Sequence, residues 1–223
     1  MLVRPVKGGR PYRSERRSEQ ARSTRQAIMA AAREQFIELG YARTTMEGIA
    51  RAAKVATITV YSTFGSKRAL LAELVGAAVS GDQATRPVYE QERAQAVFAE
   101  PDPERQLSMF ADHMWEILER VAPLFEVADH AAAVEPEIKS LRQQLLQGRL
   151  EGMRVLVRGL ASQGRLRAGV SEEEAAQTVW ALTAPQLFRL LTKDLGWERD
   201  RWSAWAAEML SRSLLPPRST PLI

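Results

Sequence analysis

The chain of 223 residues contains no cysteine and only two histidines. Without cysteine it can form neither disulfide bonds nor thiolate metal sites. The two histidines, His113 and His130, stand alone, without the spacing that a metal site needs. An acid–base or metal-dependent active site would have to be built from carboxylates, which nothing else in the sequence supports.

The sequence also lacks the short motifs of nucleophilic, phosphate-binding, dinucleotide-binding and zinc-dependent enzymes. No apolar run approaches the roughly 18 to 20 residues that span a bilayer. The basic N-terminus has no apolar segment of the kind found in secretory signals. We therefore expect a cytoplasmic protein that is not an enzyme, does not associate with membranes and has no catalytic residues, cofactor or metal.

Charge is distributed unevenly. Residues 1–26 hold eight basic and two acidic residues, a net charge of +6, whereas the whole chain carries +4, so the remainder carries −2. Such an excess is typical of a segment that neutralises nucleic-acid phosphates. A solvated, disordered tail is the competing interpretation. We expect residues 1–21, which contain glycine and proline and no periodic apolar face, to form a disordered basic arm.

The stretch TTMEGIARAAKVATITVYSTFGSK, residues 44–67, indicates two short helices joined by a tight turn. Thr44 with Glu47 predicts a capping box at the start of the first helix. In the second helix Val60 and Phe64 are four residues apart and can enter one core, which leaves the other side chains outside. Ser66 is placed to cap the next helix.

Two short helices, the second with a small and uncharged outer face, have the dimensions of a helix-turn-helix whose second member enters the DNA major groove. On periodicity alone, an ordinary helical hairpin in an all-α core is an equal alternative. A set of residues at fixed spacing helps to decide between the two: Gly40-Tyr41, Thr44-Thr45, Ile49-Ala50, Ala53-x-Val55 and Thr59-x-Tyr61-x-x-Phe64-Gly65-Ser66-Lys67-x-x-Leu70-Leu71.

Over roughly residues 22–79 this pattern resembles the DNA-binding domain of TetR-type transcriptional regulators. The resemblance implies phosphate or groove-edge contacts from Thr45, Thr59, Tyr61 and Lys67, and base contacts from Thr57, Ile58, Ser62 and Thr63. With Arg22 from the arm and Thr44 beside Thr45, the candidate DNA-binding residues are Arg22, Thr44, Thr45, Thr57, Ile58, Thr59, Tyr61, Ser62, Thr63 and Lys67.

Two positions depart from the family pattern. Lys54 stands where the family most often has glycine in the turn, and Ala56 stands where it often has a capping serine. A left-handed lysine costs about 1 kcal/mol or more, so the turn is expected to be strained or altered.

Helical periodicity predicts an all-α fold of about nine or ten helices. Residues 22–80 would form a three-helix DNA-binding domain, with the helix-turn-helix at about 45–64, and residues 81–223 a C-terminal effector-binding and dimerisation domain. In the C-terminal domain we expect helices at about 88–98, 104–121, 123–134, 136–162, 171–195 with a kink at Pro185, and 198–214.

Reading a pseudo-palindromic DNA site needs two copies of the reading helix, so we expect a homodimer formed through the helices 171–195 and 198–214. The resemblance implies the same arrangement. It also implies a small apolar or amphipathic effector inside the C-terminal domain. Large, soft or polar side chains there could contact it, although plain core packing is the commoner use of such residues. They are Met109, His113, Trp115, Leu118, Phe125, Met153, Trp180, Thr183 and Gln186.

The expected function is that of a sequence-specific transcriptional regulator of double-stranded DNA, a repressor released from its operator by the effector. The outer face of the second helix lacks Arg, Asn and Gln, so we expect apolar contacts to thymine methyl groups and hydroxyl contacts in place of bidentate purine contacts. A sequence-independent architectural DNA-binding protein is the alternative; it would bind with weak discrimination and steep salt dependence.

Overall fold

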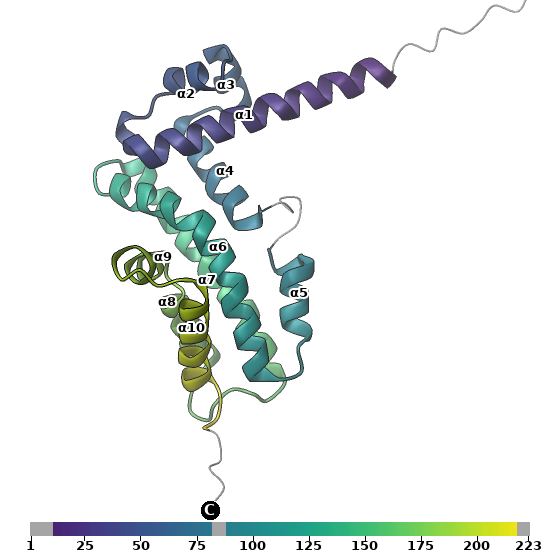
Figure 1. The fold of residues 1–223 in the computed structure, drawn as a ribbon, viewed down its shortest axis with the longest axis vertical. Coiled ribbons are helices and arrows are strands. Elements are labelled where there is room, and N and C mark those ends of the chain that lie inside the picture. The colour runs from purple at the N-terminus through teal and green to yellow at the C-terminus, as the bar shows by residue number, and fades with distance from the viewer. Residues whose placement is uncertain (1–10, 82–87, 218–223) are drawn as a thin grey trace, which may run out of the picture. The chain divides into compact units, whose positions relative to one another are not determined.

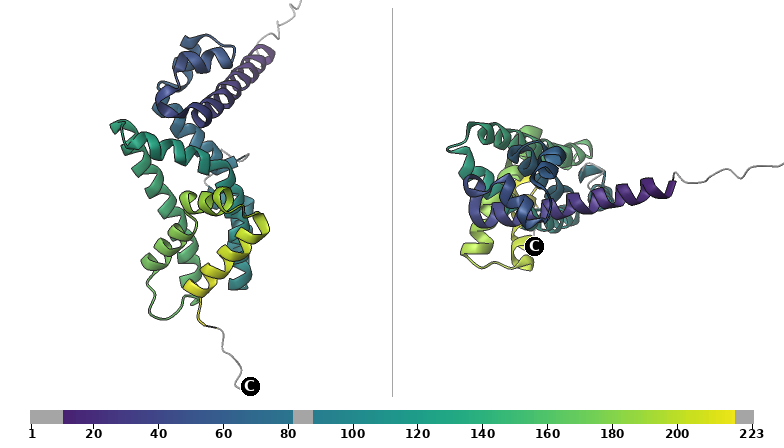
Figure 2. Two further views of the ribbon diagram at one scale, coloured as in Figure 1. Left: turned by 60° about the vertical axis from the view of Figure 1, so that its left-hand side comes forward. Right: turned by 90° about the horizontal axis from the view of Figure 1, so that it is seen from above.

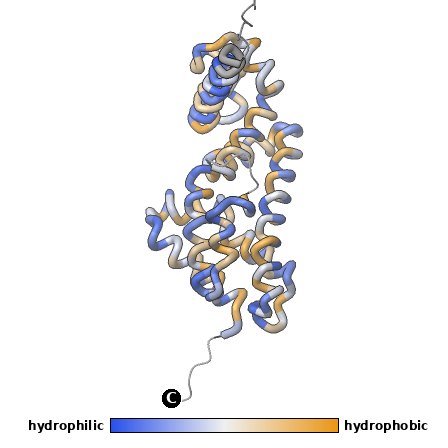
Figure 3. The backbone as a smooth tube through the Cα atoms, turned by 90° about the vertical axis from the view of Figure 1, so that its right-hand side faces the viewer, coloured by the Kyte–Doolittle hydropathy of each residue, from blue (hydrophilic) through white to orange (hydrophobic). Residues whose placement is uncertain are grey.

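The computed structural model describes residues 11–81 and 88–217, and every regular element in these ranges is helical. The all-α prediction is confirmed. The helices form two compact units that divide after Leu71, and Figure 1 labels them in chain order. Hydrophobic and hydrophilic residues alternate along most helices (Figure 3), as expected for helices that pack by one face. In the described ranges, no helix is both long enough and apolar enough to cross a membrane.

The first unit begins with the long helix α1, Pro11–Arg43. Ile28, Ala32 and Phe36 on its second half are fully buried. The predicted disordered arm is wrong for residues 11–21, which are helical, and residues 1–10 lie outside the described residues. The exposed segment 16–22 consists mostly of Arg, Glu, Gln and Ala. These residues have high helix propensity and extend a helix that its packed half has already nucleated.

Helix α2, Met46–Ala52, starts from a different cap than predicted. Thr45 is the N-cap residue, and its hydroxyl accepts the Gly48 N–H at 3.0 Å. The predicted box of Thr44 with Glu47 is therefore wrong. Gly40, with φ 75° and ψ 170°, interrupts the helical backbone near the end of α1. The N-cap of α2 lies one residue later than the sequence pattern indicated.

Helix α3, Thr57–Phe64, follows a turn through Lys54. Lys54 has φ 56° and is the one non-glycine residue with positive φ in the described part of the chain. The expected strained turn is thus present. Helix α4, Lys67–Ser80, begins after Ser66, whose hydroxyl accepts the Ala69 N–H at 3.1 Å as predicted.

The second unit contains the 3-10 turn η2, Val88–Glu90, and helix α5, Glu92–Ala99. It continues with α6, Pro103–Ala132, one helix where two were predicted. Pro123 lies inside α6 and removes one backbone hydrogen bond, to the carbonyl of Glu119, at a cost of about 3 kcal/mol. Glu119 is exposed, so water can reach that carbonyl, and burial of Leu124 and Phe125 beyond the proline offsets the loss.

Helix α7, Pro136–Ser162, matches the prediction and packs along α6 (Figures 1 and 2). Helix α8, Glu172–Leu182, starts from a capping box of Ser171 with Glu174. The predicted kink at Pro185 is instead a break. Helix α8 ends at Leu182, α9 starts afresh as Pro185–Arg189, and the π-helical turn η3, Leu190–Asp194, follows it.

Helix α10, Arg199–Leu214, completes the core of the second unit. One face of α10 is fully buried within the unit through Trp202, Ala206 and Leu210. These side chains therefore form monomer core, and only the remaining surface of α10 is available to a partner.

The strain at Lys54 yields a stability prediction. Replacing Lys54 with glycine should stabilise the first unit by about 0.5–1 kcal/mol, because glycine adopts positive φ without the steric cost that lysine has. Chemical denaturation of the wild type and K54G measures the difference.

Gly65→Ala is the matched control in the same unit. Gly65 has φ 75°, and an added Cβ would meet nothing within 4 Å, so only backbone strain acts there. This variant should lose about 1 kcal/mol or more. A K54G protein as unstable as G65A would show that the Lys54 conformation is not strained.

Candidate functional site

Helix α3 presents one face to solvent and buries the other. Val60 is fully buried and Phe64 is 7% exposed, whereas Ile58 is 74% exposed and Tyr61 is 43% exposed. Ser62 is exposed, and Thr57, Thr59 and Thr63 are half-buried. Within the first unit, the side predicted to face DNA is thus the accessible side of the helix.

Two hydroxyls on this face are bonded to the helix itself. Thr63 donates to the Thr59 carbonyl at 2.6 Å, and Ser62 donates to the same carbonyl at 3.1 Å. With its proton directed at the backbone, each hydroxyl presents acceptor lone pairs outward. Amino groups of adenine and cytosine in the major groove are donors that match these acceptors.

Thr44 must be removed from the predicted DNA-binding residues. It is fully buried, and its hydroxyl lies 2.8 Å from the Gly40 carbonyl and 3.1 Å from the Gln35 carbonyl. A side chain enclosed in this way cannot reach a phosphate. Thr45, one residue further along, is exposed at the N-terminus of α2 and remains a candidate.

Lys67 connects two parts of the first unit. Its ammonium donates to the carbonyls of Tyr41 at 2.9 Å and Thr44 at 3.0 Å, and it lies 4.2 Å from the centre of the Tyr41 ring. Two of its three N–H donors are therefore used internally. The structure gives Lys67 a role in holding α4 to the end of α1, and its phosphate contact stays a prediction.

The basic segment ahead of α3 is part of α1. Arg22 is exposed on that helix, and Arg25, one turn on, places its guanidinium 4.6 Å from the centre of the Phe64 ring. Sequence reasoning counted Arg25 only as charge. Its contact joins the basic segment to the end of α3, so the two lie in one rigid unit.

Comparison with known proteins identifies the family. Residues 28–74 match the sequence model described as bacterial regulatory proteins, tetR family. This segment therefore carries the DNA-binding sequence pattern of the TetR family of transcriptional regulators. The match spans the later part of α1, α2, the turn, α3 and the start of α4, which confirms the resemblance found in the sequence. TetR regulators are DNA-binding proteins without enzymatic activity.

Solved structures share the fold over most of the chain. NalD, the secondary repressor of the MexAB-OprM multidrug efflux pump in Pseudomonas aeruginosa, is 23% identical, with 91% of this chain and 100% of NalD covered and a TM-score of 0.63. FadR from Bacillus subtilis is 18% identical, with coverages of 83% and 96% and a TM-score of 0.66. PfmR from Thermus thermophilus is 22% identical, with coverages of 83% and 97% and a TM-score of 0.61.

Identities this low establish the fold and not the ligand. Among curated proteins, no sequence matches this chain significantly.

In the second unit, the nine residues predicted to contact an effector do not form one site. Met153, Trp180 and Thr183 gather between α7 and α8, where Arg149 joins them: its guanidinium donates to the Thr183 hydroxyl at 2.9 Å and lies 5.1 Å from the centre of the Trp180 ring. Arg149 was missed in the sequence. The sequence pattern that could have pointed to it is a charged residue at one position of an otherwise apolar helical stripe, Leu141, Leu145, Arg149 and Met153.

A second group of aromatic rings is core. Trp115 contacts Phe188 with ring centres 4.9 Å apart and Trp202 with ring centres 5.9 Å apart, and Trp202 is fully buried. Of the other predicted residues on α6, Leu118 is buried and Met109 is half-buried. The plain-core interpretation fits Trp115 and Leu118.

Phe125 and Gln186 line a cleft of about 420 Å³ between α6 and the α9–η3 segment. Its floor is apolar, with Ala122, Phe125 and Pro185. Glu126 and Asp129 on its rim are ion-paired with Arg189 and Arg142, respectively. This cleft combines an apolar surface, space and two of the predicted effector residues.

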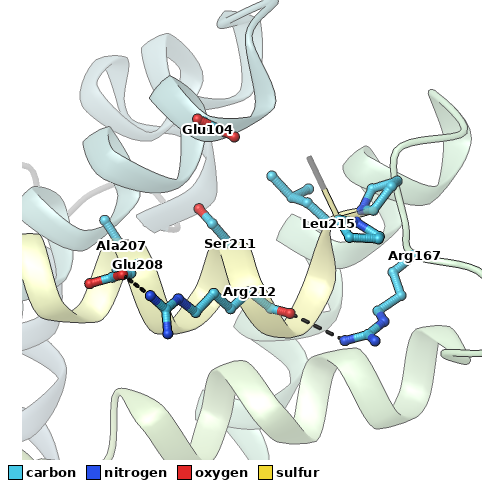
Figure 4. Close-up of a pocket in the computed structure, with 9 residues that line it drawn as sticks. Glu104, Arg167, Ala207, Glu208, Ser211, Arg212 and Leu215 are labelled. Carbon is cyan, nitrogen blue, oxygen red and sulfur yellow. Dashed lines mark hydrogen bonds and ion pairs between the residues drawn. The ribbon is translucent and has the colours of Figure 1, made fainter. Parts of the chain in front are cut away.

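A larger hollow of about 560 Å³ lies at the end of α10 and contains none of the predicted residues (Figure 4). Charged side chains bonded to their neighbours surround it: Arg212 pairs with Glu208, and Arg167 donates to the Arg212 carbonyl at 3.3 Å. It resembles an open surface depression more than a ligand site, since ligand sites are mostly apolar.

His113 is 8% exposed, and neither ring nitrogen has a hydrogen-bond partner within the described residues. Burial lowers its pKa below the ordinary 6.5, Arg93 and Arg120 lower the pKa further, and Glu116 opposes them. The folded state therefore holds His113 neutral. Because both nitrogens are buried without partners, His113 adds polarity to the core at a cost in stability.

This environment predicts a pH-dependent stability. As pH falls through 6.5, the unfolded chain protonates His113 while the folded protein does not, so the free energy of unfolding decreases. His113→Leu should flatten the stability profile between pH 7.5 and 5. Urea denaturation at several pH values measures it, with the exposed His130→Leu as control; equal slopes in H113L and wild type would contradict the prediction.

Proposed function

We propose that this TetR-family regulator is a homodimeric repressor that reads a pseudo-palindromic operator with α3 and releases it when a small molecule binds the second unit. The supporting observation is the orientation of α3, with Val60 and Phe64 buried and Ile58 and Ser62 accessible. An eight-residue helix with a free, uncharged face beside a basic helix suits a major groove flanked by phosphates.

Base readout in this proposal is chiefly apolar. Ile58 is the most exposed apolar side chain of α3 and contacts thymine methyl groups, while Ser62 and Thr63 offer acceptors to base amino groups. Thr45, Thr59, Tyr61, Lys67 and Arg22 contribute sequence-independent backbone contacts.

Separating these roles gives a mutational prediction. Ile58→Ala should reduce affinity for the specific site about five- to tenfold and leave binding to random duplex nearly unchanged. Tyr61→Phe removes a phosphate-bonding hydroxyl and should weaken binding to both DNAs by similar factors. A footprint on the DNA upstream of the gene first locates the specific site. Fluorescence anisotropy with that site and with random duplex then measures the two affinities of each variant. Equal losses on the two DNAs from I58A would remove Ile58 from base readout.

The predicted dimer uses the two C-terminal helical segments, residues 171–195 and 198–214. Trp202, Ala206 and Leu210 are occupied in the monomer core, so the partner must contact other residues. Leu190 and Leu195 are apolar and 50% and 59% exposed, and exposed apolar residues close together are typical of an interaction surface. We infer that the dimer interface includes this end of the second unit.

Charge at this surface should disrupt the dimer. Leu195→Glu is expected to yield monomers at micromolar concentration and to weaken operator binding at least about tenfold, because each half-site alone binds weakly. Light scattering coupled to size exclusion measures the mass. Val134→Glu, at an apolar side chain that is 74% exposed beyond α6, is the matched control and should stay dimeric. A dimeric L195E would move the interface elsewhere.

Effector response is supported by structures of similar fold. SmeT has been solved as a complex with triclosan and FadR as a complex with stearoyl-CoA. In this chain the effector would enter the cleft beside α9, and α4, which runs from the first unit into the second, would transmit the change. A coupling of about 1–3 kcal/mol, or 5- to 150-fold in operator affinity, is typical of such linkage.

The ratio of the affinities for upstream DNA and for unrelated duplex distinguishes a regulator from an architectural protein. A regulator binds the DNA upstream of its gene about 10³-fold or more tightly than unrelated duplex at the same salt concentration, and an architectural protein does not. The accessible, uncharged face of α3 favours a sequence-specific regulator over an architectural protein.

A further inference from the structure

Arg149 is half-buried in the second unit, with two of its guanidinium nitrogens fully buried. It lies on α7 four residues after Leu145 and four before Met153, on the helix face that packs against α8. Charged residues rarely take such positions unless they are paired. The position therefore requires an explanation beyond packing.

Most of the guanidinium is left without a partner. One terminal nitrogen, Nη2, donates to the Trp180 carbonyl and the Thr183 hydroxyl, but Nε and Nη1 are buried with no hydrogen-bond partner in the described residues. The indole Nε1 of Trp180, the ring that stacks on Arg149, is also buried without a partner. The Arg149–Trp180 pair thus contains three unsatisfied donor nitrogens.

Nor does a carboxylate balance the charge. Within the described residues, the ion pairs of this unit use other arginines, among them Arg142 with Asp129 and Arg154 with Glu173. Burial lowers the pKa of Arg149 to about 10, with no contribution from a nearby acid. A buried cation without a counter-charge is costly to the folded state.

Helix capping explains only part of this arrangement. A cation that bonds the last carbonyls of a helix is favourable, and Nη2 does this at the end of α8. Capping uses one nitrogen, however, and an exposed lysine or arginine would serve equally well. It does not account for the buried Nε, Nη1 and indole N–H.

We propose that Arg149, with Trp180, binds the carboxylate of an organic acid, and that this acid is the effector. All three unsatisfied groups are donors, so the complementary group is rich in acceptors, and a guanidinium matches a carboxylate in two parallel bonds. The Trp180 ring and Met153 favour an apolar body next to the acid group. The effector role rests on the proposed regulatory function, whereas the anion site does not.

The cleft beside α9 lies close to this site along the chain. Thr183, which accepts from Arg149, is followed by Ala184 and then by Pro185 and Gln186 in the cleft wall. The cleft wall thus begins two residues along the chain from Thr183, and Arg149 itself does not line the cleft. Acidic side chains on the rim do not exclude an anion, because Glu126 and Asp129 are already paired with arginines.

Matched acid and amide pairs test the site in the wild-type protein. Octanoate against octanamide and benzoate against benzamide differ in charge but share an apolar body. Isothermal titration calorimetry should show each acid binding about tenfold or more tightly than its amide, as charge-assisted hydrogen bonds require. Inorganic phosphate at the same ionic strength should bind more weakly than either acid. Equal affinities within the pairs, or no binding of the acids, would overturn the proposal.

Arg149→Met tests the residue itself. The variant should lose the preference for acid over amide, and without ligand it should unfold at the same or a higher temperature, because an unbalanced buried charge has been removed. Arg154→Met is the matched control, since Arg154 lies on the same helix, exposed and paired with Glu173 at 2.8 Å; it should keep the preference. A less stable R149M with the preference intact would show that Arg149 only caps α8.

Operator release, measured separately, distinguishes this proposal from the proposed function. Acids that bind through Arg149 without releasing DNA would leave the anion site standing and remove its effector role. Release by the amides, with no preference for the acids, would leave the regulator standing and overturn the Arg149 site.

Discussion

Helix α3, which we propose reads the operator, depends on two buried side chains. An isolated helix of eight residues is unstable in water, and α3 has no side-chain N-cap because Ala56 precedes it. Its stability therefore comes from the burial of Val60 and Phe64 against the rest of the first unit. The same anchoring fixes which way Ile58 and Ser62 point. Arg25 above the Phe64 ring and Lys67 bonded to the end of α1 add further restraint around this helix.

Helix α3 and the exposed half of α1 differ in charge. The accessible face of α3 is uncharged, so electrostatic attraction to DNA must come from neighbouring elements, chiefly the arginines on the exposed half of α1. Because this half is helical and continuous with the packed half, its charges are held in a fixed relation to α3. A disordered arm would have to lose conformational entropy on binding, whereas a preformed helix loses less.

In the second unit, a buried charge separates the proposed anion site from the aromatic core. The Trp115, Phe188 and Trp202 rings fill space and pack by edge-on contacts, and within the described residues the buried indole N–H of Trp202 has no hydrogen-bond partner. Arg149 and Trp180 do not satisfy each other, since both are donors. Large aromatic residues occur in both groups, so residue type cannot tell them apart. The distinction lies in charge, because Arg149 is a cation without a nearby counter-charge and the aromatic cluster contains no charged group.

Local sequence determined much of this protein. Periodicity and caps located α4, α7, α8 and α10, the inward face of α3 and the strained turn at Lys54, and motif spacing indicated the family, because all of these depend on residues a few positions apart. Tertiary structure alone decided that Thr44 is buried, that α6 continues through Pro123, that Trp115 is core and that Arg149 has no counter-charge. Each of these depends on what surrounds the residue in space, on segments distant in the chain, and a single sequence does not contain that information.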